Sequence, residues 1–241
     1  MRRRFLLLSL LPLLGSIGCS SPQPYVNTIG ALLPGSTMTV HVGDAPLSAY
    51  APAVSQPHNV FTISATAMPK GTTPPAPQLR TDRNGIVVTA PNPLAALLVR
   101  VPQRVDLVVD SQRGDVTVTD ISGNARVKAA HGNVTMMVPG YAQASTLQGN
   151  LKVTMGALDW PGTLSFSSQH GDVELWISTK ASFTVRLHTD SGTLFTDFGL
   201  QGTSSGTSET IDGSVNGGGP QRIDVETKSG AIRLLRLQPQ A

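Results

Sequence analysis

The chain has 241 residues, 39% of them hydrophobic and 5% aromatic, with a single cysteine. This length suits one β-rich domain with a sizeable core, and a lone cysteine excludes an internal disulfide. The formal charge of +3 comes from 18 Lys and Arg against 15 Asp and Glu, and three of the arginines lie at residues 2–4; without them the charges balance, so a nucleic-acid-binding protein, which needs a basic face, is not expected.

Residues 1–18 have the pattern of an export signal. Three arginines precede an apolar run that is too short to span a bilayer, and small residues follow it. The segment SIGC at residues 16–19 resembles a bacterial lipobox, in which cleavage after Gly18 leaves Cys19 as the lipidated N-terminus; a cut elsewhere in the signal is the alternative. Ser20 follows in place of an aspartate, which resembles outer-membrane sorting. The prediction is an exported bacterial lipoprotein of the cell envelope, at the outer membrane or in the periplasm.

The rest of the chain divides into a tether and one domain. Residues 19–36 are rich in Ser, Pro, Gln and Asn, a composition typical of a flexible tether. Alternation begins at Thr37 with TMTVHV, so the domain is predicted to cover residues 37–241. Proline-rich loops are expected near residues 45–58 and 68–80, because proline opposes regular hydrogen-bonded structure.

Six segments of the domain align on one glycine each. Three residues before the glycine the side chain is small or hydroxylated, and two residues after it the side chain is apolar. This alternation predicts a strand on either side of the glycine. Successive glycines lie 18, 17, 22, 21 and 38 residues apart, and the last gap holds a degenerate copy at Gly213. The corner glycines are Gly114, Gly132, Gly149, Gly171, Gly192 and Gly230.

This repeat predicts an all-β protein, a β-solenoid with coils of about 17–22 residues. The inward positions lie at odd offsets before the glycine and at even offsets after it, so the chain turns there. Glycine suits such a corner because it adopts a left-handed conformation without a Cβ clash. An antiparallel β-sandwich or meander with glycine turns is the alternative. A solenoid pairs Val116 with Val134, whereas a meander pairs residues across each glycine.

Three stretches of the chain carry a family resemblance. They are VRVPQRVDLVVDSQRGDVTV from Val99, ASFTVRLHTDSGTLFTDF from Ala181, and the ending GGGPQRIDVETKSGAIRLLRL. In their order they resemble the putative adhesin family of bacterial envelope proteins, a domain of unknown function built from Gly-Asp repeats. The resemblance covers about the last two-thirds of the chain and implies a solenoid exposed outside the cytoplasm. Thr193 and Ala231 stand where the pattern has a corner acid.

Acidic and histidine side chains recur at the corners. Asp115 and Asp172 follow their glycines, and β-helix enzymes that act on polysaccharides place carboxylates along one face. Asx residues also favour turns, so the corner position explains these acids without catalysis. His131 and His170 precede their glycines with one coil between them, about 9–10 Å apart on a solenoid, which is too far for one metal ion. We expect no metal site and no cofactor.

Two other sets of residues are candidates for a site. His188, Asp190 and Ser191 have the side chains of a catalytic triad, but neighbouring strand residues point to opposite faces and do not converge. Trp160 lies in the predicted loop LDWPG, where its ring either stacks on a sugar or covers a coil edge. With Asp115 and Asp172 it forms the candidate ligand surface.

The sequence therefore predicts a non-enzymatic, adhesin-like lipoprotein. Its N-terminal lipid attaches it to the membrane, and its solenoid presents a binding or scaffolding surface to an envelope protein or a glycan. A carbohydrate-active β-helix enzyme is the alternative.

Overall fold

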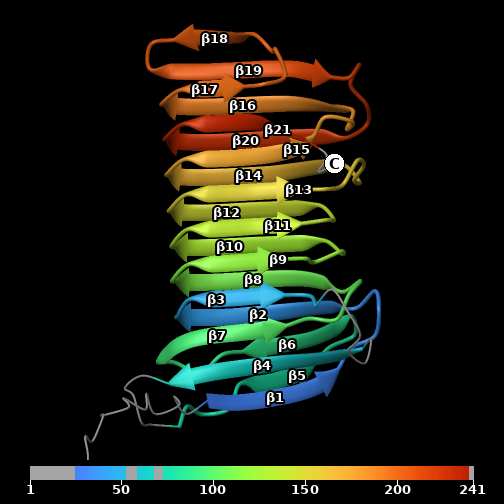
Figure 1. Ribbon diagram of the computed structural model, residues 1–241. Coiled ribbons are helices and arrows are strands. Elements are labelled where there is room, and N and C mark those ends of the chain that lie inside the picture. The colour runs from blue at the N-terminus through green and yellow to red at the C-terminus, as the bar shows by residue number, and fades with distance from the viewer. Residues whose placement is uncertain (1–24, 53–58, 68–72, 239–241) are drawn as a thin grey trace, which may run out of the picture.

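The computed structural model describes residues 25–52, 59–67 and 73–238, and all regular secondary structure within these residues is β-strand (Figure 1). The predicted signal at residues 1–18 and the predicted lipid site at Cys19 lie outside this part of the chain. No helix in the described part is long and apolar enough to cross a membrane. Two sheets lie face to face and form one elongated stack.

The described residues form 21 strands. Their bounds are β1 Tyr25–Ala31, β2 Thr37–Asp44, β3 Leu47–Tyr50, β4 Val60–Ala67, β5 Gln78–Thr81, β6 Gly85–Thr89, β7 Leu94–Arg100, β8 Asp106–Arg113, β9 Val116–Thr119, β10 Ala125–His131, β11 Val134–Val138, β12 Ala142–Gln148, β13 Leu151–Met155, β14 Thr163–His170, β15 Val173–Ser178, β16 Phe183–Ser191, β17 Leu194–Thr196, β18 Gly202–Ser205, β19 Ser208–Val215, β20 Arg222–Ser229 and β21 Ile232–Leu237. Sheet A has ten strands in the order β1-β4-β7-β3-β9-β11-β13-β15-β21-β17, and sheet B has eleven in the order β18-β19-β16-β20-β14-β12-β10-β8-β2-β6-β5.

Each central coil contributes one strand to each sheet. β8 lies in sheet B, the chain turns at Gly114, and β9 lies in sheet A; the pairs β10–β11, β12–β13 and β14–β15 repeat this path. Neighbouring coils are parallel and in register, with Val116 paired to Val134. The predicted β-solenoid is therefore confirmed. The antiparallel alternative is wrong for these coils, because it would pair the two strands on either side of each glycine.

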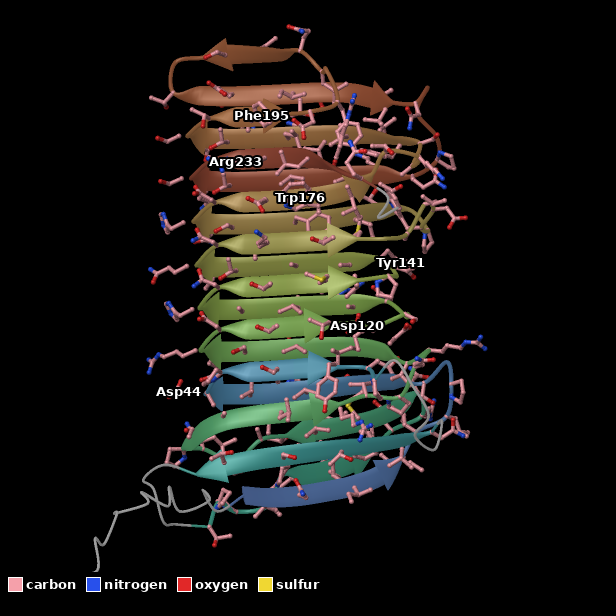
Figure 2. The ribbon with its side chains drawn as sticks, viewed as in Figure 1. Asp44, Asp120, Tyr141, Trp176, Phe195 and Arg233 are labelled. Atoms are coloured by element: carbon pink, nitrogen blue, oxygen red, sulfur yellow. The ribbon has the colours of Figure 1, made fainter. Side chains whose placement is uncertain are left out.

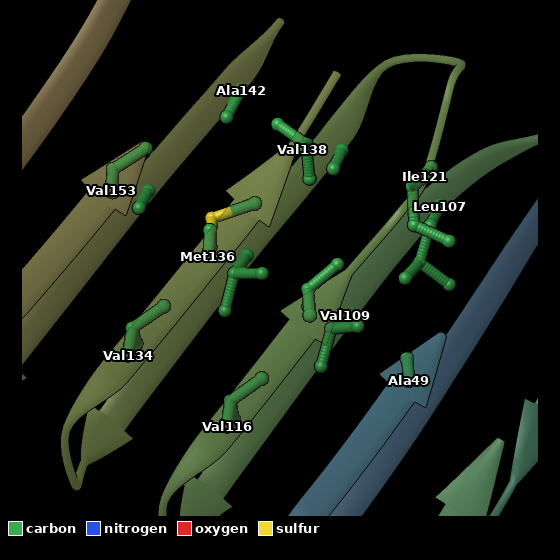
Figure 3. Close-up of a cluster of buried hydrophobic side chains, with 14 of the residues drawn as sticks. Ala49, Leu107, Val109, Val116, Ile121, Val134, Met136, Val138, Ala142 and Val153 are labelled. Atoms are coloured by element: carbon green, nitrogen blue, oxygen red, sulfur yellow. The ribbon is translucent and has the colours of Figure 1, made fainter. Parts of the chain in front are cut away.

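The core is the space between the two sheets, filled by aliphatic side chains (Figure 3). Along each strand alternate residues point inward. Val134 and Met136 of β11 are buried in this way, and each lies beside the equivalent residue of the neighbouring coils. Phe166 and Phe183 fill the same space from sheet B and are fully buried. An isolated coil would leave its row of apolar side chains exposed, and the neighbouring coils on either side complete the core.

The order of the coils in space differs from their order in the chain. The last coil, β20–β21, lies between β14–β15 and β16–β17, so β20 pairs with both β14 and β16, and β21 pairs with both β15 and β17. At the other end β2–β3 lies between β6–β7 and β8–β9. Glycine spacing could not predict this order, because any coil of the same repeat offers the same parallel register.

The expected degenerate copy at Gly213 is not a corner. Gly213 lies inside β19, which runs antiparallel to β16 and places it opposite Val185. A Cβ at Gly213 would press on the side chain of Leu200. This glycine therefore provides space for Leu200, which packs against the core at the C-terminal end of the stack.

The predicted tether at residues 19–36 is wrong from Tyr25 onward. Residues Tyr25–Ala31 form β1, which pairs antiparallel with β4 along its whole length. A Cβ at Gly30 would overlap the ring of Phe61, so the glycine allows β1 to lie close to β4. The partner strand, β4, is distant in sequence, and the edge with which β1 pairs forms only in the folded stack. Local sequence could therefore not predict β1. The domain therefore begins near residue 25, not at Thr37.

The proline-rich loops are shorter than predicted. Within the expected loop at 45–58, Leu47–Tyr50 form β3, a regular solenoid strand between β7 and β9. Its inward residues Leu47 and Ala49 are buried, but neighbouring prolines hid the alternation. The loop expected at 68–80 ends where β5 begins at Gln78. Residues 53–58 and 68–72 of these loops lie outside the described part.

Candidate functional site

The corner glycines form a column along one edge of the stack. Gly132 has a φ of 133° and Gly149 a φ of 144°, angles that glycine tolerates and other residues rarely adopt. A Cβ on Gly149 would also overlap the carbonyl oxygen of Gly132 in the neighbouring coil. The corner therefore requires glycine for two reasons, the backbone angle and the close contact between coils.

Buried hydroxyl groups line the inner side of this column. Ser168 donates to the carbonyl of Gly149 over 3.0 Å, and Thr227 donates to the carbonyl of Gly171 over 3.1 Å. Thr146 and Thr189 donate to corner carbonyls of neighbouring coils in the same way. Ala129 has no hydroxyl at this position, and the buried hydroxyl of Ser111 has no partner among the described residues.

We expect the change Thr227→Val to lower the free energy of unfolding by about 1–3 kcal/mol, because it removes a buried hydrogen-bond donor at nearly constant volume. Ser111→Ala is the matched control and should leave stability unchanged or raise it. Urea unfolding followed by circular dichroism measures both variants. Equal losses in the two would contradict a stabilising role for the hydroxyl column.

Asp or Asn follows four of the corner glycines and forms a second ladder on the outer side. Oδ1 of Asp115 accepts the backbone N–H of Asn133 at 2.8 Å, and Oδ1 of Asn133 accepts that of Asn150 at 3.0 Å. Oδ1 of Asn150 accepts the backbone N–H of Asp172, and Oδ1 of Asp172 accepts that of Ala231, each over 2.8 Å. The ladder ends at Ala231. These side chains therefore connect successive coils, whereas the preference of Asx residues for turns would place their hydrogen bonds within one turn.

This ladder separates the two candidate acids. Asp115 and Asp172 are its first and fourth members, three strand spacings of about 4.8 Å or roughly 14 Å apart. The paired carboxyl groups of glycosidases lie about 5–9.5 Å apart. Asp115 and Asp172 therefore do not form such a pair, and each has one oxygen bound to a backbone amide.

His131 and His170 lie on the column next to the glycines with Gln148 between them, as predicted. Nδ1 of His131 is 3.0 Å from Oε1 of Gln148. Among the described residues no group of three or more His, Cys, Asp or Glu is placed to hold a metal ion.

The residues of the possible triad interact only in part. Nε2 of His188 is 3.0 Å from Oδ1 of Asp190, and Nδ1 of His188 is 2.9 Å from Oγ1 of Thr210 on β19. His188 and Asp190 are two residues apart and share one face of β16, whereas Ser191 has the opposite parity. Both ring nitrogens of His188 are therefore engaged, and the hydroxyl beside its Nδ1 belongs to Thr210 and not to Ser191.

Trp160 does not belong to an exposed ligand surface, and that expectation is wrong. Its side chain is 5% exposed, and its ring centroid lies 5.7 Å from that of Phe183. Nε1 of Trp160 donates to the carbonyl of Arg222 over 3.2 Å. The apolar ring covers the open edge between the two sheets. Residues distant in sequence, Phe183 and Arg222, form the part of the edge that it contacts.

The exposed face of sheet A carries a row of side chains that the sequence analysis did not single out. Its members occupy equivalent positions in six neighbouring strands, and in five of these strands the position is five residues after the corner glycine. An odd offset after the glycine points outward, so the parity rule could have found them. We call these residues the sheet A row: Tyr50, Thr119, Met137, Thr154, Trp176 and Leu235.

Trp176 has a fixed position within the sheet A row (Figure 2). Its Nε1 donates to Oε1 of Glu174 over 2.7 Å, and Nζ of Lys152 lies 3.0 Å from the same oxygen. Because Glu174 is two residues away on the same strand, the indole extends along β15. The hydrogen bond from Trp176 is the main cause that lowers the pKa of Glu174, and Lys152 adds to it. A half-buried aromatic ring is thus held on the outer face of sheet A.

The two sheets, the glycine column and the parallel register define a β-solenoid with two open faces. The chain belongs to the Toastrack DUF4097 family. The family model matches residues 103–235, which are more than half of the chain. This match runs from just before β8 into β21.

The solved structures that this chain resembles include two bacterial proteins. A putative cell adhesion protein from Clostridium sporogenes is 9% identical, covers 88% of this chain and 100% of its own, and has a TM-score of 0.46. A putative adhesin from Bacteroides fragilis is 10% identical, covers 88% and 98%, and has a TM-score of 0.40. The curated proteins contain no match to this chain.

Proposed function

We propose that this protein is a non-enzymatic, exported lipoprotein, and that its solenoid presents a binding or scaffolding surface at the cell envelope, as an adhesin does. The observation that carries the proposal is the sheet A row. Its side chains contribute nothing to the core, yet one of them, Met137, is an apolar residue that is 57% exposed. Tyr50, Trp176 and Leu235 of the row are also aromatic or apolar and half-buried, and a group of such side chains outside the core is typical of an interaction surface.

Trp176 is the expected centre of this surface. Aromatic side chains that are already held in place bind partners with little loss of conformational entropy. The indole is held by Glu174, and the neighbouring strand β21 adds the exposed cation Arg233 beside Glu174 (Figure 2). A ring with polar and charged neighbours suits either a glycan or an envelope protein as the partner.

The role of the other polar residues supports a binding function over catalysis. Asp115 and Asp172 connect coils through backbone amides, and His188 is bound on both ring nitrogens. These contacts support a structural role for the candidate catalytic groups.

The attachment part of the proposal assigns the lipid to Cys19. We expect the full chain to incorporate labelled palmitate in a bacterial host and to sediment with membranes. Cys19→Ala should abolish both, and a Cys19→Ala variant that remains labelled would contradict the assignment.

We expect Trp176→Ala to weaken binding of the partner at least tenfold, because buried tryptophans at interfaces contribute about 2 kcal/mol or more. Leu147→Ala is the matched control: Leu147 is 46% exposed and comes from β12 of sheet B. Purified protein is tested on immobilised envelope fractions and on an array of bacterial glycans, with unfolding curves recorded for both variants. The absence of any ligand for the wild-type protein, or equal losses in both variants, would contradict the proposed surface.

A further inference from the structure

We propose that the N-terminal end of the solenoid rests on the surface of an anionic phospholipid bilayer. This inference depends on the proposed lipid at Cys19. We call this end the membrane end and define it by β1, β5 and the turns at residues 32–36, 82–84 and 102–105. In Figure 1 it is the end of the stack where β1 and β5 lie.

The number of residues between Cys19 and β1 limits how far this end can lie from the membrane. Only residues 20–24 separate Cys19 from Tyr25, the first residue of β1. Six residue steps of about 3.3–3.6 Å reach roughly 20 Å even when fully extended. A lipid on Cys19 would therefore hold the membrane end near the headgroups.

Apolar side chains are unusually exposed at the membrane end. Ile29 of β1 is 68% exposed and Leu33 in the following turn is 69% exposed. Leu79 of β5 adds a third apolar side chain, 41% exposed. Exposed side chains of this kind can enter the interfacial region of a bilayer, where apolar burial adds to electrostatic attraction.

The same end is basic although the chain without its signal is balanced, with 15 Lys and Arg against 15 Asp and Glu. The membrane end contains three arginines, Arg80, Arg83 and Arg104, and one acid, Asp82, a net charge of +2, and Arg100 lies nearby in β7. The acid, Asp82, accepts two backbone N–H groups through Oδ1. No ion pair within the described residues involves the four arginines, which are Arg80, Arg83, Arg100 and Arg104.

The charge and the exposed apolar groups together match one occupant, the surface of a bilayer with acidic headgroups. Each basic residue near such a surface strengthens binding about fivefold. Three of the arginines, Arg80, Arg83 and Arg104, are exposed in β5 or in the turns of the membrane end. A soluble polyanion would make no favourable contact with the apolar side chains of Ile29 and Leu33, whereas a bilayer contacts both the basic and the apolar groups.

This orientation also places the proposed binding surface away from the membrane. In sheet A seven strand spacings separate β1 from β15, which carries Trp176. At about 4.8 Å each they amount to roughly 34 Å. The solenoid would thus act as a spacer with the lipid at one end and the sheet A row farther along its length.

The test uses the mature chain, residues 19–241, with Cys19→Ser so that no lipid contributes. It is sedimented with vesicles of phosphatidylcholine alone and of phosphatidylcholine with one third phosphatidylglycerol. We expect binding to the anionic vesicles that weakens as salt rises. The triple variant R80Q/R83Q/R104Q should bind about a hundredfold less tightly, and I29S/L33S should lower binding at high salt.

A variant with the same change in charge elsewhere is the control. R126Q/K128Q/K228Q removes three exposed cations from sheet B and should bind vesicles like the wild-type protein. Equal loss in the two triple variants, or no binding of the wild-type chain to anionic vesicles, overturns the inference. The vesicle assay involves neither the lipid on Cys19 nor the sheet A row. If the protein binds a ligand but no vesicles, this inference is therefore wrong and the proposed function still stands.

Discussion

A chain that ends at Gly219, and therefore lacks β20 and β21, is expected to lose the folded stack and not merely one coil. These strands lie between β14–β15 and β16–β17, so their removal breaks strand pairs on both sides in both sheets. It also removes four fully buried side chains from the core, Ile223, Val225, Ile232 and Leu234. At about 2–5 kcal/mol each, their loss is comparable with the 5–15 kcal/mol that stabilises a typical domain.

Circular dichroism, gel filtration and limited proteolysis of the truncated chain measure this result. A chain that ends at Gln238 keeps both strands and serves as the control. If the chain ending at Gly219 folds into a shorter solenoid with β16 paired directly to β14, the inserted coil is not needed for folding and the prediction is wrong.

The substitution Gly149→Ala should lower the free energy of unfolding by about 4 kcal/mol, the largest effect we expect from a change of this size. The left-handed backbone angle accounts for about 1–3 kcal/mol, and the overlap of the new Cβ with the carbonyl of Gly132 accounts for a similar amount. Urea unfolding at constant slope measures the change.

Gly206→Ala separates these two contributions. Gly206 also has a positive φ, 63°, but a Cβ there meets nothing within 4 Å. Gly206→Ala should therefore lower the free energy of unfolding by only about 1 kcal/mol. Equal losses at Gly149 and Gly206 would mean that the close contact between coils costs nothing, against the account of the corner given above.

The structure divides the repeat into positions that hold the coils together and positions that remain free. Inward residues, corner glycines and the residues beside them all make contacts between coils. The outward positions of sheet A lie outside the core, and their contacts between coils, such as the ion pair of Lys152 with Glu174, are on the surface. Trp176 and Met137 occupy such positions, which is why we propose a binding function for them.

The candidate site was only partly predictable from the sequence. The corner position of Asp115 and Asp172 followed from the repeat, but their hydrogen bonds to the next coil depend on the distance between coils. For Trp160 the sequence left two positions open, on a sugar or over a coil edge, and the packing against Phe183 decides for the edge. Trp176 could have been assigned to the outer face from its offset to Gly171, since the same parity governs every coil.

The sequence by itself determined the coil. Glycine at a fixed position and alternation on both sides of it specify two strands and a corner, because these features depend only on residues close together in the chain. The order of coils was decided only in the tertiary structure, where β20–β21 and β2–β3 are inserted between other coils. Parallel coils of one repeat pair equally well in several orders, and the choice depends on how distant segments pack at the two ends.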